Sequence, residues 1–369
     1  MDIQSKIQEL LYTLVRDGRE RGVQIAVYFE GKLVIDAWAG TLDGSQPVDG
    51  RTLFPVFSVT KGMAATLLHI LAERGQISYE TPLAEVWPEF AAHGKGGIRV
   101  RHALNHTAGL QYAPKGVGYA QLCDWNAMCA IMADQTPVAP PGTQMFYHAV
   151  TFSWLVGEVV RRVSGRPFGA FLEQEICRPL GITDMYVGIP DAVESRVAIL
   201  DEIFADGSPP VVDDTHPQSI PGWILPLHTM MNRPDARRAC IPASNGIMSA
   251  RAIAKHYAAL IPGGVAGVEL LPPARVRQAT QLQRLNDGTC GEYFGLGYGL
   301  IGLPADKSTL PPGPTPTPSA FGHGGYGGAH GYADPQYRLA VGFTKNLYSP
   351  RSGGSELMAA VRDLLGLPK

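Results

Sequence analysis

The two ends of the chain carry the clearest patterns of apolar and polar positions. Apolar side chains at helical spacing predict an amphipathic helix over residues 3–16 and a terminal helix over residues 355–366. Short apolar stretches bounded by turn residues predict four strands, at residues 23–29, 32–40, 329–333 and 339–346. Strands near both termini indicate one antiparallel sheet formed from both ends of the chain and flanked by helices.

The middle of the chain has the pattern of helices. One apolar helix begins near Ser58 and ends at the C-cap glycine Gly75. Further helices are predicted at about 99–110 (short, running into a loop), 119–133, 149–163, 166–180 and 249–260. Residues 190–240 show little periodicity and predict a long irregular segment, and the part from 205 to 235 could cover a site. The five prolines within 307–319 predict a stiff surface loop.

These elements predict an α/β (α+β) fold in which a mainly helical region is inserted into a sheet made from both termini. We expect one domain over residues 1–369. Its α/β subdomain would cover about 1–80 and 240–369, and its mainly helical subdomain about 81–239.

Composition narrows the classes of partner. With 369 residues, of which 45% are hydrophobic and 17% charged, the chain can bury a sizeable core. A net charge of −2 without a basic run gives no support for a nucleic-acid or membrane-surface partner. The five scattered cysteines argue against a disulfide framework and a zinc site. No apolar run has the length of a membrane span and no secretory signal is recognisable, so we expect a cytoplasmic protein.

The most informative short pattern is a serine three residues before a lysine, Ser58-Val59-Thr60-Lys61. Positions i and i+3 share a helix face, so the Lys61 amine can lie beside the Ser58 hydroxyl. A serine is a weak nucleophile until a base takes its proton, and a lysine can be that base where burial lowers its pKa. The apolar helix after Lys61 indicates burial. The spacing alone is common, and its ordinary meaning is an N-cap serine with a solvated lysine.

Two further stretches carry candidate chemistry. Tyr147 lies between a Pro-Gly turn and an apolar helix, where a tyrosinate could act as general base if the Lys61 cation lowered its pKa; the ordinary role of such a tyrosine is packing. Residues 321–332 hold six glycines, which indicates backbone that a ligand or another element approaches closely. The segment has no nucleotide-binding pattern, and His323 and His330 lack a partner at metal-ligand spacing. A G-x-S-x-G elbow is also absent from the sequence.

Taken together, Ser58-x-x-Lys61, Tyr147 and His323-Gly324-Gly325 resemble the three ordered motifs of the serine beta-lactamase and penicillin-binding-protein superfamily. Stretches at 100–110, 178–182 and 242–251 are also similar to this family, and the resemblance covers about residues 20–365. It is closer to the class C-like branch, which holds family VIII carboxylesterases, D-aminopeptidases, DD-peptidase-type enzymes and related acyltransferases. The resemblance implies a beta-lactamase/transpeptidase-like fold in a single catalytic domain.

The resemblance also implies roles for individual residues. Ser58 corresponds to the acylated nucleophile, and Lys61 and Tyr147 to its proton-handling partners. The backbone N–H groups of Ser58 and Tyr326 would form the oxyanion hole. Substrate-binding positions would be His148, His323, Gly324 and Gly325. Neither a metal nor an organic cofactor is implied.

Two departures from the beta-lactamase pattern change the expected substrate. The tyrosine motif ends in Ala149 where beta-lactamases of this branch have Asn, so a contact to the acylamido side chain is missing. The third motif begins with His323 and lacks the Lys-Thr-Gly pattern, so the groups that hold a beta-lactam carboxylate are lost. Both changes favour a neutral acyl substrate.

We therefore expect a serine carboxylesterase that acts on a small-molecule ester through a Ser58 acyl-enzyme. An acyltransferase using the same acyl-enzyme, a beta-lactamase or D-amino-acid peptidase-type amidase, and a catalytically silent scaffold or binding module remain as alternatives. His102 and His106 are expected to be structural. Six aromatic residues could line an apolar acyl pocket: Tyr112, Tyr119, Trp125, Phe146, Trp223 and Tyr326. The acyl-chain length and the oligomeric state stay open.

Overall fold

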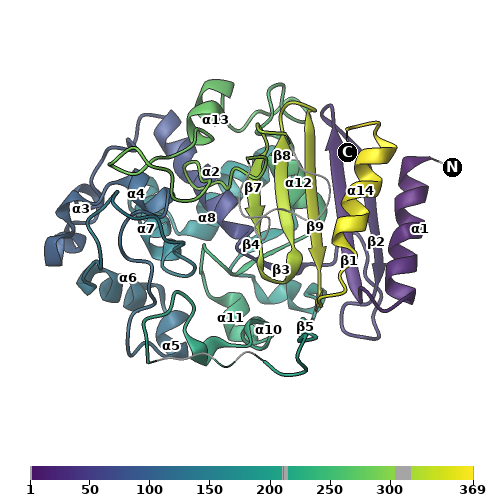
Figure 1. The fold of residues 1–369 in the computed structure, drawn as a ribbon, viewed down its shortest axis with the longest axis horizontal. Coiled ribbons are helices and arrows are strands. Elements are labelled where there is room, and N and C mark those ends of the chain that lie inside the picture. The colour runs from purple at the N-terminus through teal and green to yellow at the C-terminus, as the bar shows by residue number, and fades with distance from the viewer. Residues whose placement is uncertain (1, 210, 212–214, 304–316, 369) are drawn as a thin grey trace.

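The centre of the molecule is a five-stranded antiparallel sheet made from both ends of the chain (Figure 1). A computed structural model describes residues 2–209, 211, 215–303 and 317–368. The sheet order is β2-β1-β9-β8-β7, with β1 (Gly22–Phe29), β2 (Lys32–Gly40), β7 (Phe321–Gly324), β8 (His330–Asp334) and β9 (Leu339–Lys345). Since β1 pairs antiparallel with β9, the predicted sheet from both termini is confirmed.

Helices from different parts of the chain cover the two faces of this sheet. Val23, Ile25 and Val27 of β1 pack into one apolar cluster with α1 (Ile3–Arg16) and α14 (Gly354–Leu364). Figure 1 shows these terminal helices, purple and yellow, side by side at one end of the molecule. On the opposite face α12 (Ala250–Ala258) packs against β1, β8 and β9. The alternation of side chains along β1 therefore divides its residues between two cores.

Two paired glycines let α12 approach the sheet. Gly331 of β8 and Gly342 of β9 are opposite each other in register. A Cβ atom at position 342 would lie 2.1 Å from the Ala250 carbonyl oxygen, and one at position 331 would lie 2.3 Å from Ile253 Cγ2. Any larger residue at these positions would have to push the helix away from the strands.

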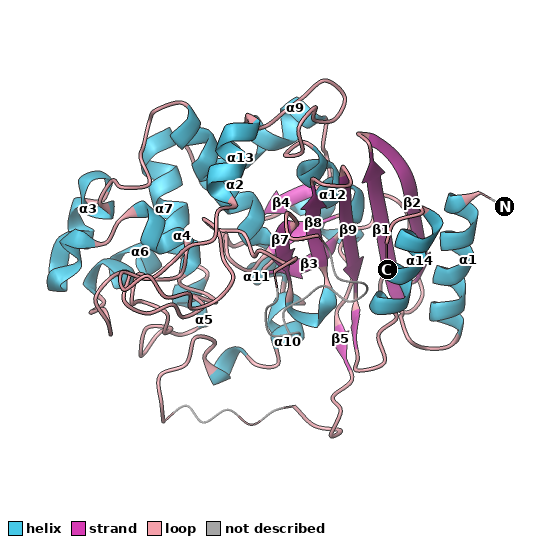
Figure 2. Ribbon diagram, turned by 45° about the horizontal axis from the view of Figure 1, so that its top comes forward, coloured by secondary structure: helices cyan, strands magenta, loops and turns pink. Residues whose placement is uncertain are grey.

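The helices between β3 and β6 form a second body beside the large sheet (Figure 2). Its central helix, α2 (Thr60–Glu73), is buried along nearly its whole length and packs against α7. The remaining helices of this body are α3 (Leu83–Val86), α4 (Val100–Leu104), α5 (Tyr119–Leu122), α6 (Trp125–Asp134), α7 (Phe152–Ser164), α8 (Phe168–Leu172), α9 (Arg178–Leu180), α10 (Leu227–Met231) and α11 (Pro234–Arg238). Short 3-10 or π turns are η1 (Pro88–Gly97), η2 (Glu173–Cys177), η3 (Asp191–Arg196) and η4 (Gly222–Ile224).

Two small sheets lie where the chain passes between the large sheet and the helical body. β3 (Phe54–Phe57), β6 (Gly246–Met248) and β4 (Met185–Val187) form an antiparallel sheet in the order β3-β6-β4. β5 (Asp201–Glu202) pairs in parallel with β10 (Leu347–Tyr348). The first of these sheets fixes the segment directly before Ser58, and the second ties the long 190–240 segment to the C-terminal strands.

Several predicted elements differ in detail. The predicted helix 119–133 is two helices, because Asp124 caps α6 by accepting from the Ala127 N–H. The predicted helix 166–180 consists of α8, a π turn and α9. The 190–240 segment is not wholly irregular, since it contains α10 and α11. The sequence patterns also missed the strands β3, β4, β6 and β7 and the helix α13 (Pro273–Ala279). Of the predicted loop 307–319, residues 307–316 lie outside the described residues.

The proposed subdomain boundaries near residues 80 and 240 stay a prediction. Among the helices of the described residues, none is both long enough and apolar enough to cross a membrane.

The close packing of α12 can be tested at Gly342. Gly342→Ala should destabilise the protein by about 2–3 kcal/mol, because the new methyl group overlaps the backbone of the helix. Gly96→Ala is a matched control, since a Cβ there meets no atom within 4 Å. Urea unfolding of both variants measures the difference. Equal stabilities of the two variants would contradict this account of the packing.

Candidate active site

Ser58 lies in the turn between β3 and α2. The preceding residue, Phe57, has a φ of +46°, a left-handed conformation that is unusual for a bulky side chain. Thr60 holds the turn, since its hydroxyl donates to the Phe57 carbonyl at 2.5 Å and accepts from the Gly246 N–H at 2.8 Å. The Lys61 N–H closes the turn on the Ser58 carbonyl at 3.0 Å. The serine is thus presented at the start of a buried helix, as the apolar pattern predicted.

The Lys61 amine is fully buried beside this hydroxyl. Its Nζ lies 3.1 Å from Ser58 Oγ, 2.8 Å from the Ala149 carbonyl oxygen and 3.0 Å from the Ala243 carbonyl oxygen. Burial lowers the pKa of Lys61 well below its ordinary value. A neutral amine has two N–H donors and one lone pair. In this neutral form the two carbonyls can take up both donors, which leaves the lone pair for the Ser58 hydroxyl proton.

Tyr147 lies next to this pair with its ring centre 4.7 Å from Lys61 Nζ. Its ring also contacts those of His106, at 4.8 Å, and Phe294, at 6.1 Å. Burial raises the pKa of Tyr147, and a hydrogen bond with Ser58 acts against this without cancelling it. Burial works against the hypothesis that a Lys61 cation makes Tyr147 a tyrosinate, because it lowers the pKa of Lys61 and raises that of Tyr147. The general-base role of Tyr147 stays a prediction.

His323 ends up beside Tyr147, although it comes from the far end of the chain. Its Nδ1 lies 2.7 Å from the Gly324 carbonyl oxygen and its Nε2 3.5 Å from the Tyr147 hydroxyl. A carbonyl can only accept, so Nδ1 carries the proton and Nε2 accepts from the Tyr147 hydroxyl. Burial, with the nearby Lys61 as a smaller cause, lowers the pKa of His323 to about 3. His323 is therefore an uncharged group that orients the Tyr147 hydroxyl.

The structure does not bring His148 into the site. This side chain is fully buried, with Nδ1 2.6 Å from the Phe146 carbonyl oxygen and Nε2 accepting from the Leu110 N–H at 3.2 Å. Both ring nitrogens are used to hold the loop before α7, so the predicted substrate contact is not supported. His106 accepts from the His148 N–H at 3.2 Å, and His102 accepts from the Arg99 N–H at 3.1 Å. The expected structural role of these two histidines is confirmed.

The glycine-rich segment after β7 passes close to Ser58. A Cβ atom at Gly325 would lie 2.1 Å from the Val56 carbonyl oxygen, so only glycine permits this approach. The Tyr326 ring lies 5.6 Å from that of Phe57, the residue before Ser58. A Cβ atom at Gly324 would meet nothing within 4 Å, so this position faces open space. In the turn after β3, the N–H groups of Val59, Lys61 and Gly62 bond to carbonyls of the described chain, but that of Ser58 does not.

A small apolar cavity of about 60 Å³ opens beside Ser58. Polar groups at its lining come from Ser58, Tyr147, Ser244 and Tyr326. The rest of the lining is apolar: Phe57, Leu122, Ala149, Val150, Ile220, Ile224, Leu227, Met230, Met231 and Ile241. Of the six aromatic residues proposed for an acyl pocket, Tyr326 alone is among the described residues that line it.

The apolar wall of this cavity was not predicted residue by residue. Much of it comes from residues 220–231, so the expectation that the 205–235 segment covers the site is confirmed for that part. A signal was present, since Leu227, Met230 and Met231 have the i, i+3, i+4 spacing of a short amphipathic helix.

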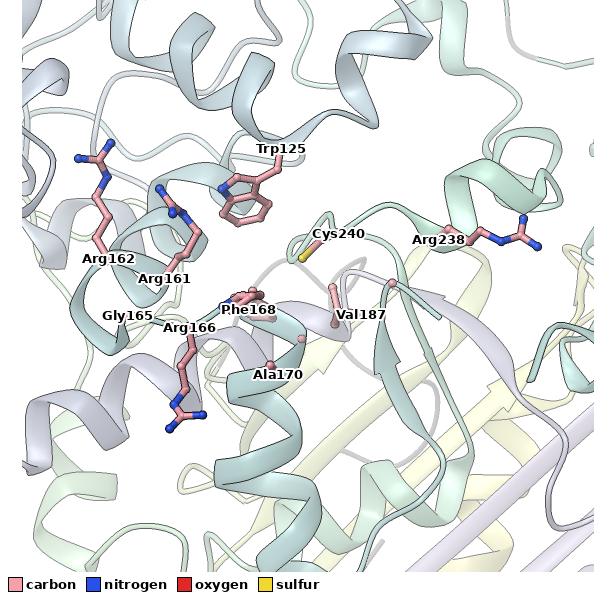
Figure 3. A pocket seen from close by; sticks show the side chains of 13 residues that line it. Trp125, Arg161, Arg162, Gly165, Arg166, Phe168, Ala170, Val187, Arg238 and Cys240 are labelled. Carbon is pink, nitrogen blue, oxygen red and sulfur yellow. The ribbon is translucent and has the colours of Figure 1, made fainter. Parts of the chain in front are cut away.

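A larger cavity, of about 560 Å³, lies elsewhere in the helical body (Figure 3). Trp125, Phe168 and Cys240 are among its lining residues, and Figure 3 shows Arg166 and Arg238 pointing away from Trp125 and Phe168. Two other arginines at its rim, Arg161 and Arg162, are both paired with the buried Glu158 at 2.6 Å. This cavity lacks the Ser58, Lys61 and Tyr147 group, so size alone does not identify the reactive site.

The candidate site contains no obvious metal ligand set. Within the described ranges, no three His, Cys, Asp or Glu residues are grouped so that they could hold a metal ion. His330 lies on β8 with its Nδ1 3.3 Å from the Gly328 carbonyl oxygen.

The antiparallel sheet from both termini, the inserted helices and the grouping of Ser58, Lys61 and Tyr147 together define a beta-lactamase/transpeptidase-like fold. The sequence profile of the Beta-lactamase family matches residues 7–364, and the chain belongs to this family. The resemblance and the beta-lactamase/transpeptidase-like fold inferred from the sequence are confirmed.

Individual relatives have several activities. The chain is 33% identical over 351 residues to Esterase/beta-lactamase LipL of Mycobacterium tuberculosis. The aligned region covers 89% of this chain and 78% of LipL. Two solved structures superpose with a TM-score of 0.83 and cover 99% of this chain and 98% of theirs. One is a penicillin-binding protein homolog from Caulobacter crescentus, at 31% identity, and the other is a family VIII carboxylesterase, at 32% identity.

The state of Lys61 predicts the pH dependence of catalysis. If the neutral amine is the base, kcat/KM for a p-nitrophenyl ester should be lost as the pH falls through the lowered pKa of Lys61, and should be level above it. Lys61→Arg should lower kcat/KM by about 10³-fold at every pH, because a guanidinium keeps its proton. An acid limb centred near the ordinary lysine pKa, or an active Lys61→Arg variant, would contradict the assignment.

Proposed function

We propose that this protein is a serine carboxylesterase of the family VIII type, with Ser58 as its nucleophile. One observation carries the proposal: the fully buried Lys61 Nζ lies 3.1 Å from Ser58 Oγ and is held there by the carbonyl oxygens of Ala149 and Ala243. The names of relatives at 32–33% identity, an esterase/beta-lactamase and a family VIII carboxylesterase, support the same reaction class.

In the acylation step, Ser58 Oγ attacks the ester carbonyl carbon and its proton passes to Lys61 Nζ. The carbonyl oxygen becomes an oxyanion, which accepts hydrogen bonds from the N–H groups of Ser58 and Tyr326. Each such donor typically contributes about 3–4 kcal/mol to the transition state. The bond to the alcohol oxygen then breaks. Tyr147 gives its hydroxyl proton to the leaving alkoxide and regains one from the Lys61 ammonium.

Deacylation reverses these proton movements with water in place of the alcohol. A water molecule loses a proton to Lys61 as its oxygen bonds to the acyl carbon. The bond between the acyl carbon and Ser58 Oγ breaks, the carboxylic acid leaves, and the proton returns to Ser58. Lys61 and Tyr147 therefore accept and release protons in turn, and both are uncharged before the substrate binds.

The site favours a neutral ester over a beta-lactam. Ala149 offers no side-chain amide to an acylamido group, and His323, which burial keeps neutral, offers no cation to a carboxylate. The cavity next to Ser58 is lined mainly by aliphatic side chains, which suits a short apolar acyl group.

The nucleophile is tested by hydrolysis of p-nitrophenyl acetate, butyrate and octanoate, with nitrocefin in parallel. Ser58→Ala should lower ester turnover by about 10⁴-fold or more while thermal unfolding stays unchanged. Trapping of a butyryl group on Ser58 by mass spectrometry should fail in the same variant. Rapid nitrocefin turnover with slow ester hydrolysis would replace the esterase by a beta-lactamase.

The acyl pocket is tested at Met230, which lines the cavity on α10. Met230→Ala should raise the ratio of kcat/KM for octanoate over acetate roughly tenfold, because the wall of a small apolar pocket discriminates by chain length. Met128→Ala is the matched control, since Met128 is also buried but is not among the residues that line the cavity. A similar change of the ratio in both variants would show that Met230 does not contact the acyl chain.

A further inference from the structure

The loop that carries the Tyr326 N–H has a single side chain. Its sequence is Gly324-Gly325-Tyr326-Gly327-Gly328, and Gly327 and Gly328 have φ values of +81° and +102°. Glycine backbone has little conformational preference of its own, whereas an oxyanion donor must be held in place before the reaction starts. The Tyr326 side chain is therefore the part of this loop that can fix it.

Both ends of the Tyr326 side chain are held. Its ring packs edge-on against Phe57 at 5.6 Å and against Tyr348 at 5.7 Å. Its hydroxyl donates to Glu202 Oε1 at 2.5 Å. Phe57 directly precedes Ser58, so these contacts join the two backbone segments that supply the oxyanion donors. A hydrogen bond to a carboxylate is stronger than one between neutral groups, which makes Glu202 the firmest of these anchors.

The second oxygen of Glu202 reaches a different element of the site. Glu202 Oε2 accepts from His228 Nδ1 at 3.1 Å, and His228 lies on α10. The Glu202 and His228 side chains are only 10% and 17% exposed. The short strand β5 fixes Glu202 by pairing with Tyr348 of β10. Since α10 supplies Leu227, Met230 and Met231 to the cavity, one carboxylate bonds both to the oxyanion loop and to the helix that forms part of the acyl-pocket wall.

We propose that Glu202 is a positioning residue for this reaction: through the Tyr326 hydroxyl it sets the backbone N–H of Tyr326, and through His228 it ties that donor to α10. The inference rests on the proposed esterase function. It assigns the Tyr326 phenol a role separate from that of its backbone. It also means that Glu202 holds the oxyanion loop and α10, which lines the pocket, in a fixed position relative to each other.

The test compares Tyr326→Phe, Glu202→Leu and the double variant. Tyr326→Phe keeps the ring contacts and the backbone N–H but removes the hydrogen bond to Glu202. Each single variant should lower kcat for p-nitrophenyl butyrate roughly tenfold and change KM less than twofold, because misaligned donors weaken transition-state binding only. The double variant should lose no more than the worse single variant, since one interaction is removed in both.

A second readout does not depend on ester turnover. With p-nitrophenyl ethyl butylphosphonate, Ser58 Oγ bonds to phosphorus as p-nitrophenolate leaves, and the phosphoryl oxygen occupies the oxyanion position. The phosphonylation rate should fall in the same variants by a similar factor. Tyr12→Phe, an exposed tyrosine on α1, is the control and should match the wild type in both assays. Melting curves report any loss of folding separately.

The inference is overturned if Tyr326→Phe keeps kcat and the phosphonylation rate within twofold of the wild type. Independent, multiplying losses in the double variant would also overturn it, as would a loss confined to KM or to the melting temperature. If the wild type reacts with the phosphonate at Ser58 but does not turn over esters, the proposed function fails while the phosphonylation rates still decide the role of Glu202. If Ser58 does not react with the phosphonate, both fail.

Discussion

One buried amine constrains the rest of the structure. The Lys61 side chain can be fully buried because two segments remote from α2 in the chain, those of Ala149 and Ala243, bring carbonyl oxygens to its Nζ. An ammonium group in this position is costly, and burial lowers the pKa of Lys61 well below its ordinary value. The surrounding Tyr147 and His323 are neutral for the same reason. The resulting site has a base of lowered pKa among uncharged neighbours, which suits an uncharged ester better than a substrate held by its carboxylate.

Much of the fold could be predicted where the apolar period is long and regular. The helix 3–16, the strands 23–29 and 32–40 and the terminal helix agree with α1, β1, β2 and α14 within one or two residues. The misses have physical causes. β7 is half glycine, so its sequence does not look like a strand, and β3 is only four residues long and contains Pro55. The break at Asp124 depends on a side-chain cap that competes with an otherwise continuous helical pattern.

The residues of the candidate site also fall into those that the sequence predicted and those that it did not. Ser58, Lys61, Tyr147 and His323 could be found because short motifs with fixed spacing mark them, and the structure brings all four together. His148 was placed in the site only because it is next to Tyr147, and its ring turns into the core instead. The apolar wall and Glu202 come from a segment of weak periodicity, and they reach the site through contacts between distant residues. No local pattern reports such contacts, so the acyl pocket required the three-dimensional structure.

The pairing of β1 with β9 has a consequence for how the protein is made. On the ribosome, β1, β2 and the Ser58 turn are made before the helical body, and the strand β9 that completes their sheet is made after it. Until then the nascent β1–β2 hairpin exposes an unpaired edge and its apolar faces, which are prone to association with other chains. Contacts this distant in sequence also form slowly. The candidate active site is therefore incomplete until β9 has been made, and a chain that stops short of β9 is an aggregation risk rather than a weak enzyme.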